Sequence, residues 1–190
     1  MADQVTAQDS SQNFKAHDEG QFAASCADVV DLGERLEQYP GKPSRVVRKV
    51  ALVFVTNSSG ETKDISAEMT LSMNERAALR AFLEAWRGKS YTPEQAAAGV
   101  PLDKLERAGA LISVEHKRSA KGRTYGKIKT IAPLPAGLTA PVLNGYTRAE
   151  FWQGRKKAYA EEVARYKQTL VASSEFPNEP PPDEDDDLPF

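Results

Sequence analysis

Hydrophobic positions in the first third of the chain follow a strand-like pattern. Residues 21–32 mix small and β-branched side chains without helical spacing and stop at Gly33, which predicts a first strand. Residues 45–55 are dense in valine and lie between two turn signals, so they predict a second strand. Alternation over residues 64–73 predicts a third strand after a hairpin turn. Its apolar face carries Ile65, Ala67, Met69 and Leu71.

The spacing then changes to that of an amphipathic helix. Apolar residues recur every three or four positions over residues 78–86, Asn74 is a suitable N-cap, and Gly88 ends the run. The Thr-Pro-Glu sequence at residues 92–94 predicts the start of a second, short helix. Residues 102–108 predict a further helical turn or two.

Strand character returns after these helices. Residues 111–117 and 124–131 predict strands four and five, which are joined by a loop and ended by Pro133. Three strands, a helix and two strands is the order of an OB-fold, a five-stranded Greek-key barrel with its helix between strands three and four. The predicted fold class is therefore mainly β with helices (α+β), as an OB-fold-like barrel. An unrelated α+β sheet with the same order is the alternative.

A further helix is predicted beyond the barrel, because Thr147 and Glu150 form a capping box before a helical pattern that runs to about Leu170. Its apolar stripe is expected to pack on the barrel, and dimerisation or clamping of DNA are the alternatives. The stripe consists of Tyr159, Val163, Tyr166 and Leu170. The predicted organisation is a disordered leader at residues 1–13, an OB-fold-like domain at 14–133, a linker at 134–146, a basic amphipathic helix at 147–171 and a disordered acidic tail at 172–190.

Charge is strongly separated along the chain, although the net charge is only -2. All 25 Lys and Arg residues precede residue 171, where 20 acids accompany them, and the other seven acids follow. Residues 42–129 alone hold 17 basic residues against nine acids. A cationic body of this kind suits a phosphate backbone, and an acidic arm can fold onto such a body or be displaced from it.

The residue types needed for catalysis or metal binding are sparse. His17 and His116 have no Cys or second His at metal-ligand spacing, and neither a Gly-rich phosphate loop nor a nucleophile motif is present. We therefore expect a binding protein, not an enzyme, that needs no cofactor or metal. The single cysteine, Cys26, excludes an internal disulfide. Without a signal peptide or a membrane-spanning run, we expect the protein in the cytoplasm.

A site for single-stranded nucleic acid needs cations for the phosphates and flat side chains for unstacked bases. Tyr125, Lys127 and Lys129 alternate along strand five, so the pleat points them to one outer face and points Ile128 into the barrel. Tyr125 has two interpretations, a base-stacking platform or an aromatic residue of the barrel rim. The predicted DNA-binding residues are Arg45, Arg48, Lys49, Lys117, Arg118, Lys121, Arg123, Tyr125, Lys127 and Lys129.

The last eight residues have a signature of their own. Five acids at residues 183–187 keep the segment in water, and the Leu-Pro-Phe that follows offers a small apolar plug for a partner's pocket. The segment resembles the acidic tip of bacterial single-stranded DNA-binding proteins, which ends in Asp-Leu-Pro-Phe or Asp-Ile-Pro-Phe. That resemblance implies that the tip recruits replication and repair enzymes and competes for the basic groove when DNA is absent; a solubilising tail is the alternative. The predicted partner-binding residues are Asp185, Asp186, Asp187, Leu188, Pro189 and Phe190.

The body of the chain, from Phe14 to about Pro133, resembles a family of bacteriophage proteins. The matching motifs are Ala-His-Asp-Glu-Gly at residues 16–20, Lys-Val-Ala-Leu-Val at 49–53, Leu-Ser-Met at 71–73 and Phe-Leu-Glu-Ala-Trp-Arg-Gly-Lys at 82–89. Members of that family are phage-encoded single-stranded DNA-binding proteins of OB type, so the resemblance implies this fold and activity, in the cytoplasm of the host cell. The chain departs from the bacterial cellular proteins in its body sequence and its long basic helix. Their tetrameric assembly is therefore not implied, and a homo-oligomer is left open.

Together these features predict a sequence-nonspecific single-stranded DNA-binding protein that coats strands during phage DNA replication or recombination. Its acidic tip would recruit replication and recombination enzymes to the coated strand. The alternative is an interaction protein that does not bind DNA and that mimics the host tip to capture host replication proteins. A third hypothesis, an annealing recombinase, requires assembly into a ring or filament.

Overall fold

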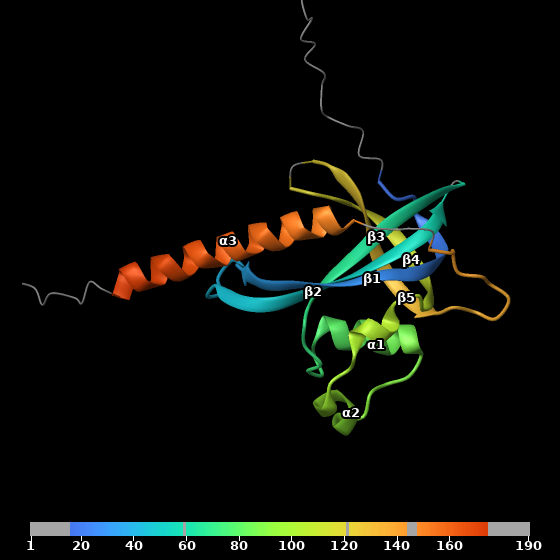
Figure 1. The fold of residues 1–190 in the computed structure, drawn as a ribbon, viewed down its shortest axis with the longest axis horizontal. Coiled ribbons are helices and arrows are strands. Elements are labelled where there is room, and N and C mark those ends of the chain that lie inside the picture. The colour runs from blue at the N-terminus through green and yellow to red at the C-terminus, as the bar shows by residue number, and fades with distance from the viewer. Residues whose placement is uncertain (1–15, 59, 121, 144–147, 175–190) are drawn as a thin grey trace, which may run out of the picture.

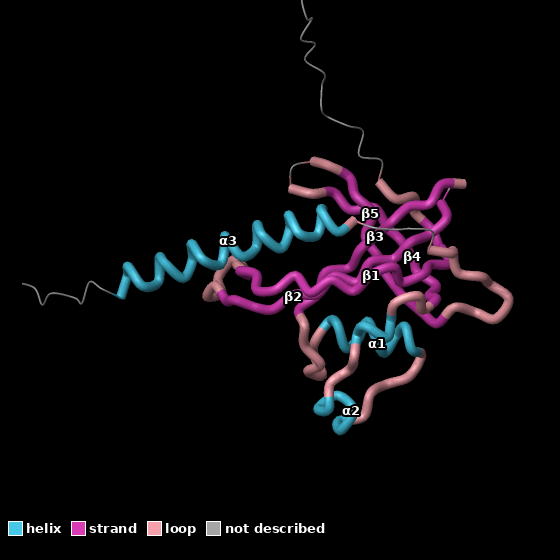
Figure 2. The backbone as a smooth tube through the Cα atoms, viewed as in Figure 1, coloured by secondary structure: helices cyan, strands magenta, loops and turns pink. Residues whose placement is uncertain are grey.

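The computed structural model describes residues 16–58, 60–120, 122–143 and 148–174, without the side chains of residues 172–174. The fold is mainly β with helices, as predicted (Figures 1 and 2). None of the described helices is long and apolar enough to cross a membrane. In chain order the elements are β1 (Gly20–Glu37), β2 (Arg45–Ser58), β3 (Glu61–Thr70), α1 (Ala78–Arg87), α2 (Pro93–Ala98), the 3₁₀ helix η1 (Leu102–Leu105), β4 (Gly109–Arg118), β5 (Thr124–Pro133) and α3 (Ala149–Ser174).

The five strands form one sheet in the order β3-β2-β1-β4-β5, and every neighbouring pair is antiparallel. The sheet curls so that its two edge strands, β3 and β5, lie close to one another, and α1 packs against both of them. In the described part of the chain no hydrogen-bonded ladder joins β3 to β5. Figure 1 shows α1 and α2 on one side of the sheet and α3 on the other. The curled sheet therefore has an inner face with a core and an outer face that α3 covers in part.

The main core lies between the inner face of the sheet and α1. Leu52 and Phe54 of β2 are fully buried there against Leu83 and Trp86 of the helix. The Phe54 and Trp86 rings meet edge-on with their centroids 5.2 Å apart. The indole Nε1 of Trp86 donates to the Gly109 carbonyl at 2.9 Å, so the one polar group of this side chain is satisfied. Helix α1 thus closes one end of the curled sheet with its apolar stripe.

A second, smaller core lies on the outer face, where α3 packs on β1 and β2. Trp152 is only 4% exposed and packs among Leu32, Ala51 and Val53, and Tyr159 adds to the cluster. The predicted stripe is correct in Tyr159 and Val163, whereas Leu170 is 49% exposed. Trp152, seven residues before Tyr159, continues the same stripe and is its main anchor. The helix also runs three residues past the predicted end at residue 171.

The prediction that the first strand stops at Gly33 is wrong. β1 continues to Glu37, and its register with β2 shifts between Asp31 and Gly33. Gly33 has φ +73°, and its backbone N–H donates to Asp31 Oδ1 at 2.9 Å. A glycine in this conformation can form a β-bulge, which bends a strand without ending it. The sequence signal for a strand end at Gly33 is therefore a bulge within β1.

The start of α1 also differs from the prediction. Asn74 is not the N-cap, because α1 begins four residues later, at Ala78. Its side-chain oxygen accepts from the Arg76 backbone N–H at 3.2 Å in the turn before the helix. Ala77 occupies the N-cap position without a side-chain hydrogen bond. The end at Gly88 is confirmed, with φ +67° and its N–H bonded to the last turn. The start of α2 is confirmed as well, since Thr92 forms a capping box.

Two further strand boundaries move because pairing partners decide them. β3 ends at Thr70, which pairs with Lys49, so its predicted continuation to residue 73 is wrong. β5 continues through Pro133, which pairs with Ala110. β5 is an edge strand, where a proline need not donate to a further ladder, so Pro133 does not stop it. The predicted leader, Thr147 of the capping box and the tip at residues 185–190 lie outside the described residues.

Candidate functional site

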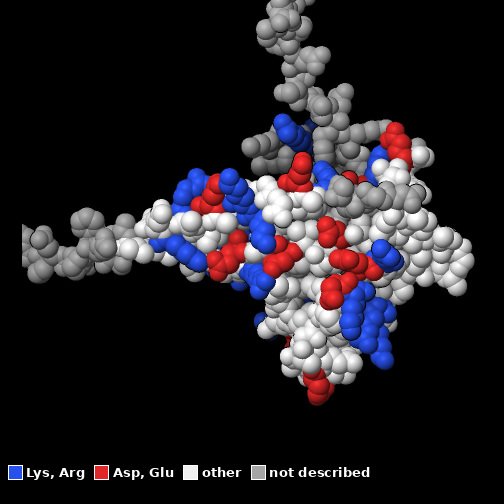
Figure 3. Space-filling model, viewed as in Figure 1, with Lys and Arg blue, Asp and Glu red and all other residues white. Residues whose placement is uncertain are grey.

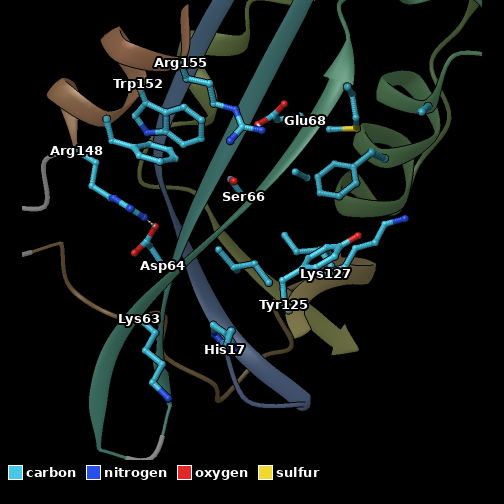
Figure 4. Close-up of a pocket in the computed structure, with 18 of the residues that line it drawn as sticks. His17, Lys63, Asp64, Ser66, Glu68, Tyr125, Lys127, Arg148, Trp152 and Arg155 are labelled. Atoms are coloured by element: carbon cyan, nitrogen blue, oxygen red, sulfur yellow. Dashed lines mark hydrogen bonds and ion pairs between the residues drawn. The ribbon is translucent and has the colours of Figure 1, made fainter. Parts of the chain in front are cut away.

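A groove of about 920 Å³ lies between the two edge strands (Figure 4). Residues 62–69 of β3 form one wall and residues 125–128 of β5 the other. The first turns of α3 close one end of the groove, and Phe82 of α1 also lines it. The groove therefore follows the seam where the sheet is not joined by hydrogen bonds.

Two exposed aromatic rings line this groove. Tyr125 on β5 is 39% exposed, and Phe151 on α3 is 44% exposed. The guanidinium carbon of Arg148 lies 4.4 Å from the centroid of the Phe151 ring, and that of Arg155 lies 6.0 Å from it. Flat, accessible rings beside cations are the two components that unstacked bases and phosphates require.

The charged residues of the groove are largely paired with one another. Arg148 donates to Asp64, and Arg155 forms a 2.7 Å ion pair with Glu68. The hydroxyl of Tyr159 donates to the same Glu68 carboxylate at 2.9 Å, so α3 is attached to the outer side of β3. The burial of that hydroxyl raises the pKa of Tyr159. These pairs fix the position of α3 but leave little free positive charge along the β3 wall.

His17 forms part of the groove wall through a structural network. Its Nδ1 donates to the Asp18 carbonyl at 2.9 Å, and its Nε2 lies 2.6 Å from Thr56 Oγ1. The His17 carbonyl in turn accepts from His116 Nε2 at 2.8 Å. A Cβ at Gly126 would lie 2.9 Å from the Cβ of His17, so only glycine lets this segment lie against β5. Among the described residues no group of His, Cys, Asp and Glu side chains is arranged to hold a metal ion.

The predicted cations of the second strand lie away from the groove and are paired. Arg45 donates to Glu37 at 2.8 Å, and Lys49 donates to the same carboxylate from a position that is only 8% exposed. The Lys49 hydrogen bond holds the pKa of Glu37 below its ordinary value. Arg48 is exposed and bonds to Asp31, whose pKa it lowers in the same way. Lys49 is thus a buried partner of Glu37, which the sequence pattern did not reveal.

The predicted cations of the β4–β5 hairpin divide into two groups. Lys117 and Lys129 both face Glu115, at 2.9 and 3.7 Å, and the Lys117 hydrogen bond lowers the pKa of that carboxyl. A second group makes no ion pair with any described residue. Its members are Arg118, Arg123 and Lys127. Lys121, also predicted to bind DNA, lies outside the described residues. In the face drawn in Figure 3, Lys and Arg likewise alternate with Asp and Glu over α3 and the sheet beside it.

The predicted orientation of strand five is confirmed. Tyr125 and Lys127 are exposed and line the groove, while Ile128 is 8% exposed and belongs to the main core. The pairing with β4 shifts by one residue after Ile128, so Lys129 is the extra residue of a β-bulge. The predicted row is therefore interrupted next to Glu115, and of its members only Tyr125 and Lys127 reach the groove.

Several groove residues were missed by sequence reasoning. Lys63, Arg148, Phe151 and Arg155 come from β3 and α3, far from strand five in the chain. Lys63 forms a 3.0 Å ion pair with Asp18, a residue of the loop before β1. No local pattern brings these positions together, because the curl of the sheet and the docking of α3 do so. Comparisons with protein-family models, with curated proteins and with solved structures find no match to this chain.

Proposed function

We propose that this chain is a sequence-nonspecific single-stranded DNA-binding protein whose strand-binding site is the groove between β3 and β5. The observation that carries this proposal is the position of Tyr125 and Lys127 side by side on the groove wall, both accessible. A ring and a cation in that arrangement suit one nucleotide, through base stacking and phosphate neutralisation. No base-edge readout is required.

The arrangement of strands supports an OB-type barrel. The sheet order β3-β2-β1-β4-β5, with the helix α1 between β3 and β4, is consistent with an OB-fold barrel that is open between its third and fifth strands. In OB folds the face of strands two and three commonly binds oligonucleotides. Here α3 covers that face with Trp152, which leaves the adjacent β3–β5 groove and the β4–β5 hairpin for a DNA strand.

The cations without a carboxylate partner among the described residues favour a phosphate path along the β4–β5 hairpin. Arg118, Arg123 and Lys127 form no ion pair with described residues, whereas Lys49 and Arg48 are paired with carboxylates. A phosphate contact from a paired cation must first displace its carboxylate, so it contributes less to affinity. We infer that the DNA path follows this hairpin into the groove and that Lys49 has no phosphate contact.

The sequence of the acidic tip supports a second part of this proposal, a role in binding partner proteins. The terminal Asp-Leu-Pro-Phe resembles the recruiting tip of bacterial single-stranded DNA-binding proteins, and the matching motifs of the body resemble phage members of the same functional class. We propose that residues 185–190 bind replication and recombination enzymes, with Phe190 as the apolar anchor. Phage DNA replication or recombination is the process that these resemblances favour.

A second candidate function is favoured by the neutralised cations. If the carboxylates that pair with Arg45, Arg48 and Lys49 remain in place, the body has little attraction for phosphates. The protein would then be an interaction protein that captures host replication enzymes through its tip. This candidate requires that oligonucleotides do not bind.

The experiment is fluorescence anisotropy of labelled oligo-dT and of a duplex of equal length, over a range of salt concentrations. With three or four effective phosphate contacts, we expect a log-log slope of roughly -2 to -3 for the single strand, whereas all nine predicted cations would give roughly -6. Changing Lys127 and Lys129 together to Ala should make the slope shallower by about 1 and leave the melting temperature nearly unchanged. The control variant carries the same double substitution to Ala at Lys89 and Lys104, which are exposed and lie outside the groove. Absence of oligo-dT binding by the unmodified chain would exclude the proposed function and leave the second candidate.

A further inference from the structure

The first two turns of α3 present an aromatic ring to the same groove. We propose that Phe151 is a base-stacking residue and that α3 remains docked as a wall of the site when DNA binds. This inference rests on the proposed function and extends it to a helix outside the five-stranded sheet. Phe151 lies on α3, which closes one end of the groove, and Tyr125 lies on its β5 wall.

The exposure of Phe151 is the first observation that supports this role. Of the three exposed aromatic side chains in the described residues, Tyr125 and Phe151 both line this groove, and only Tyr39 lies elsewhere. Phenylalanine has no polar tip to satisfy in water, so a 44% exposed ring leaves apolar surface that a stacked base can cover. The flanking guanidinium groups of Arg148 and Arg155 are flat and lie beside the ring, and because both are paired with carboxylates they contribute planar surface and not free charge.

The anchoring of the neighbouring residue is the second observation. Trp152 is buried among Leu32, Ala51 and Val53, so the helix cannot rotate about its axis without exposing the indole. Adjacent residues point about 100° apart around a helix, and burial of Trp152 therefore directs Phe151 to the side, toward the groove. Figure 4 shows Trp152, Arg148 and Arg155 together along the α3 side of the groove.

Two ion pairs between α3 and β3, one at Arg148 and one at Arg155, hold the Phe151 ring in this orientation. Arg148 is bonded to Asp64, and Arg155 is bonded to Glu68 and to the Tyr159 hydroxyl at 3.0 Å. Both guanidinium groups thus reach from α3 to β3 while they face the Phe151 ring. A ring that is fixed before the strand arrives loses little conformational entropy on stacking.

The opposite interpretation is that α3 covers the DNA-binding face of the sheet and is displaced by DNA. The two interpretations predict opposite effects of removing the ring. If Phe151 stacks on a base, its loss weakens binding. If α3 is a cover, loosening it frees the sheet face and strengthens binding.

The experiment compares the full-length chain with Phe151→Ala on two probes of equal length, oligo-dT and an oligonucleotide of abasic sites. We expect Phe151→Ala to weaken oligo-dT binding about 5- to 150-fold, the range for one base on an aromatic platform, and to change binding of the abasic probe less than about twofold. Phe151→Leu, which keeps an apolar side chain but has no ring, should behave as Phe151→Ala does. Phe151→Tyr should restore oligo-dT binding, and Tyr39→Ala, which removes an exposed aromatic side chain outside the groove, should leave it unchanged.

Three outcomes would overturn the inference. Unchanged oligo-dT binding by Phe151→Ala would exclude stacking on this ring, and an equal loss on both probes would show that the ring only supports the phosphate contacts. Tighter binding would show that α3 is a displaceable cover. If Tyr125→Ala weakens oligo-dT binding while Phe151→Ala does not, the proposed function stands and only the role of α3 fails. If the unmodified chain does not bind oligo-dT, both proposals fail.

Discussion

The two tryptophans of this protein differ in the hydrogen bonding of their indole N–H, so the same substitution should destabilise the protein at one position and be nearly neutral at the other. The Trp152 indole N–H is buried and finds no hydrogen-bond acceptor in the described part of the chain. The Trp86 indole N–H is bonded to the Gly109 carbonyl at 2.9 Å. Both side chains are nearly inaccessible, 4% and 6% exposed, and both have aromatic neighbours. Changing each of them to Phe therefore isolates the contribution of the N–H group.

The magnitudes follow from the two environments. Shrinking either indole to a phenyl ring leaves a small void and removes apolar contact, which costs ~1–2 kcal/mol. A buried polar group without a partner costs ~1–3 kcal/mol, and Trp152→Phe removes that penalty together with the N–H. We expect the two effects to cancel to within ~1 kcal/mol for Trp152→Phe. Trp86→Phe instead leaves the Gly109 carbonyl without its donor and should destabilise the protein by ~2–4 kcal/mol.

The assay is urea denaturation followed by far-UV circular dichroism, because each variant alters the fluorescence but not the backbone signal. Trp152 anchors α3, and Trp86 lies in the main core, so hydrogen exchange of α3 amides should accompany the measurement. That second measurement separates loosening of α3 from global unfolding. Trp152→Ala serves as the reference for complete loss of the anchor and should leave α3 amides poorly protected.

Either of two results would refute this reasoning. If Trp152→Phe destabilises the protein as strongly as Trp86→Phe, the Trp152 N–H has an acceptor in solution and its apparent isolation has no energetic consequence. A Trp86→Phe variant as stable as the unmodified protein would refute the other half, since it would mean that the hydrogen bond to Gly109 contributes nothing.

Three further predictions concern titration, thiol reactivity and the tip. Lys49 and Arg45 hold the pKa of Glu37 below 4.5, so the unfolded chain binds a proton at this carboxylate more readily than the folded chain does. The stability that this group contributes should therefore be complete above pH 4.5 and be lost as the pH falls through the lowered pKa. Glu37→Gln should flatten that part of a plot of melting temperature against pH. Burial raises the pKa of Cys26 to about 12, so the native thiol should not react with Ellman's reagent at pH 8 and should react fully in denaturant, and rapid native reaction would contradict its burial. Deleting residues 183–190 should tighten oligo-dT binding at low salt and abolish partner capture, whereas deleting Phe190 alone should abolish only partner capture; a pull-down with replication enzymes that survives the Phe190 deletion would identify the tip as a solubilising tail.

Local signals in the sequence were sufficient for most elements. The alternation that places Tyr125 outside and Ile128 inside depends only on the pleat of one strand, and it is correct. The helix end at Gly88 and the capping box at Thr92 involve a few adjacent backbone groups, so short motifs specify them. The order of strands and helix follows from these elements and supports the mainly β class.

The strand ends, and the pairing of cations with carboxylates among the described residues, depend on the tertiary structure. The local sequence at Gly33 predicts the end of a strand, but β1 continues beyond this residue because it remains paired with β2 after a bulge. The strand pattern predicts that Lys49 is an exposed cation, but the pairing of β1 with β2 brings Glu37 beside it and both residues are buried. Each outcome depends on a partner strand whose register no local window contains.

The candidate site depends most on the tertiary structure. Lys63, Tyr125 and Phe151 are separated by tens of residues and meet only because the sheet curls β3 toward β5 and α3 docks across its outer face. Charge and ring shape are properties of single residues, so the amino-acid sequence is sufficient to name the side chains that could contact a nucleic acid. Which of them share one groove is a property of packing, because the burial of Trp152 sets the position of the helix and with it the α3 end of the groove.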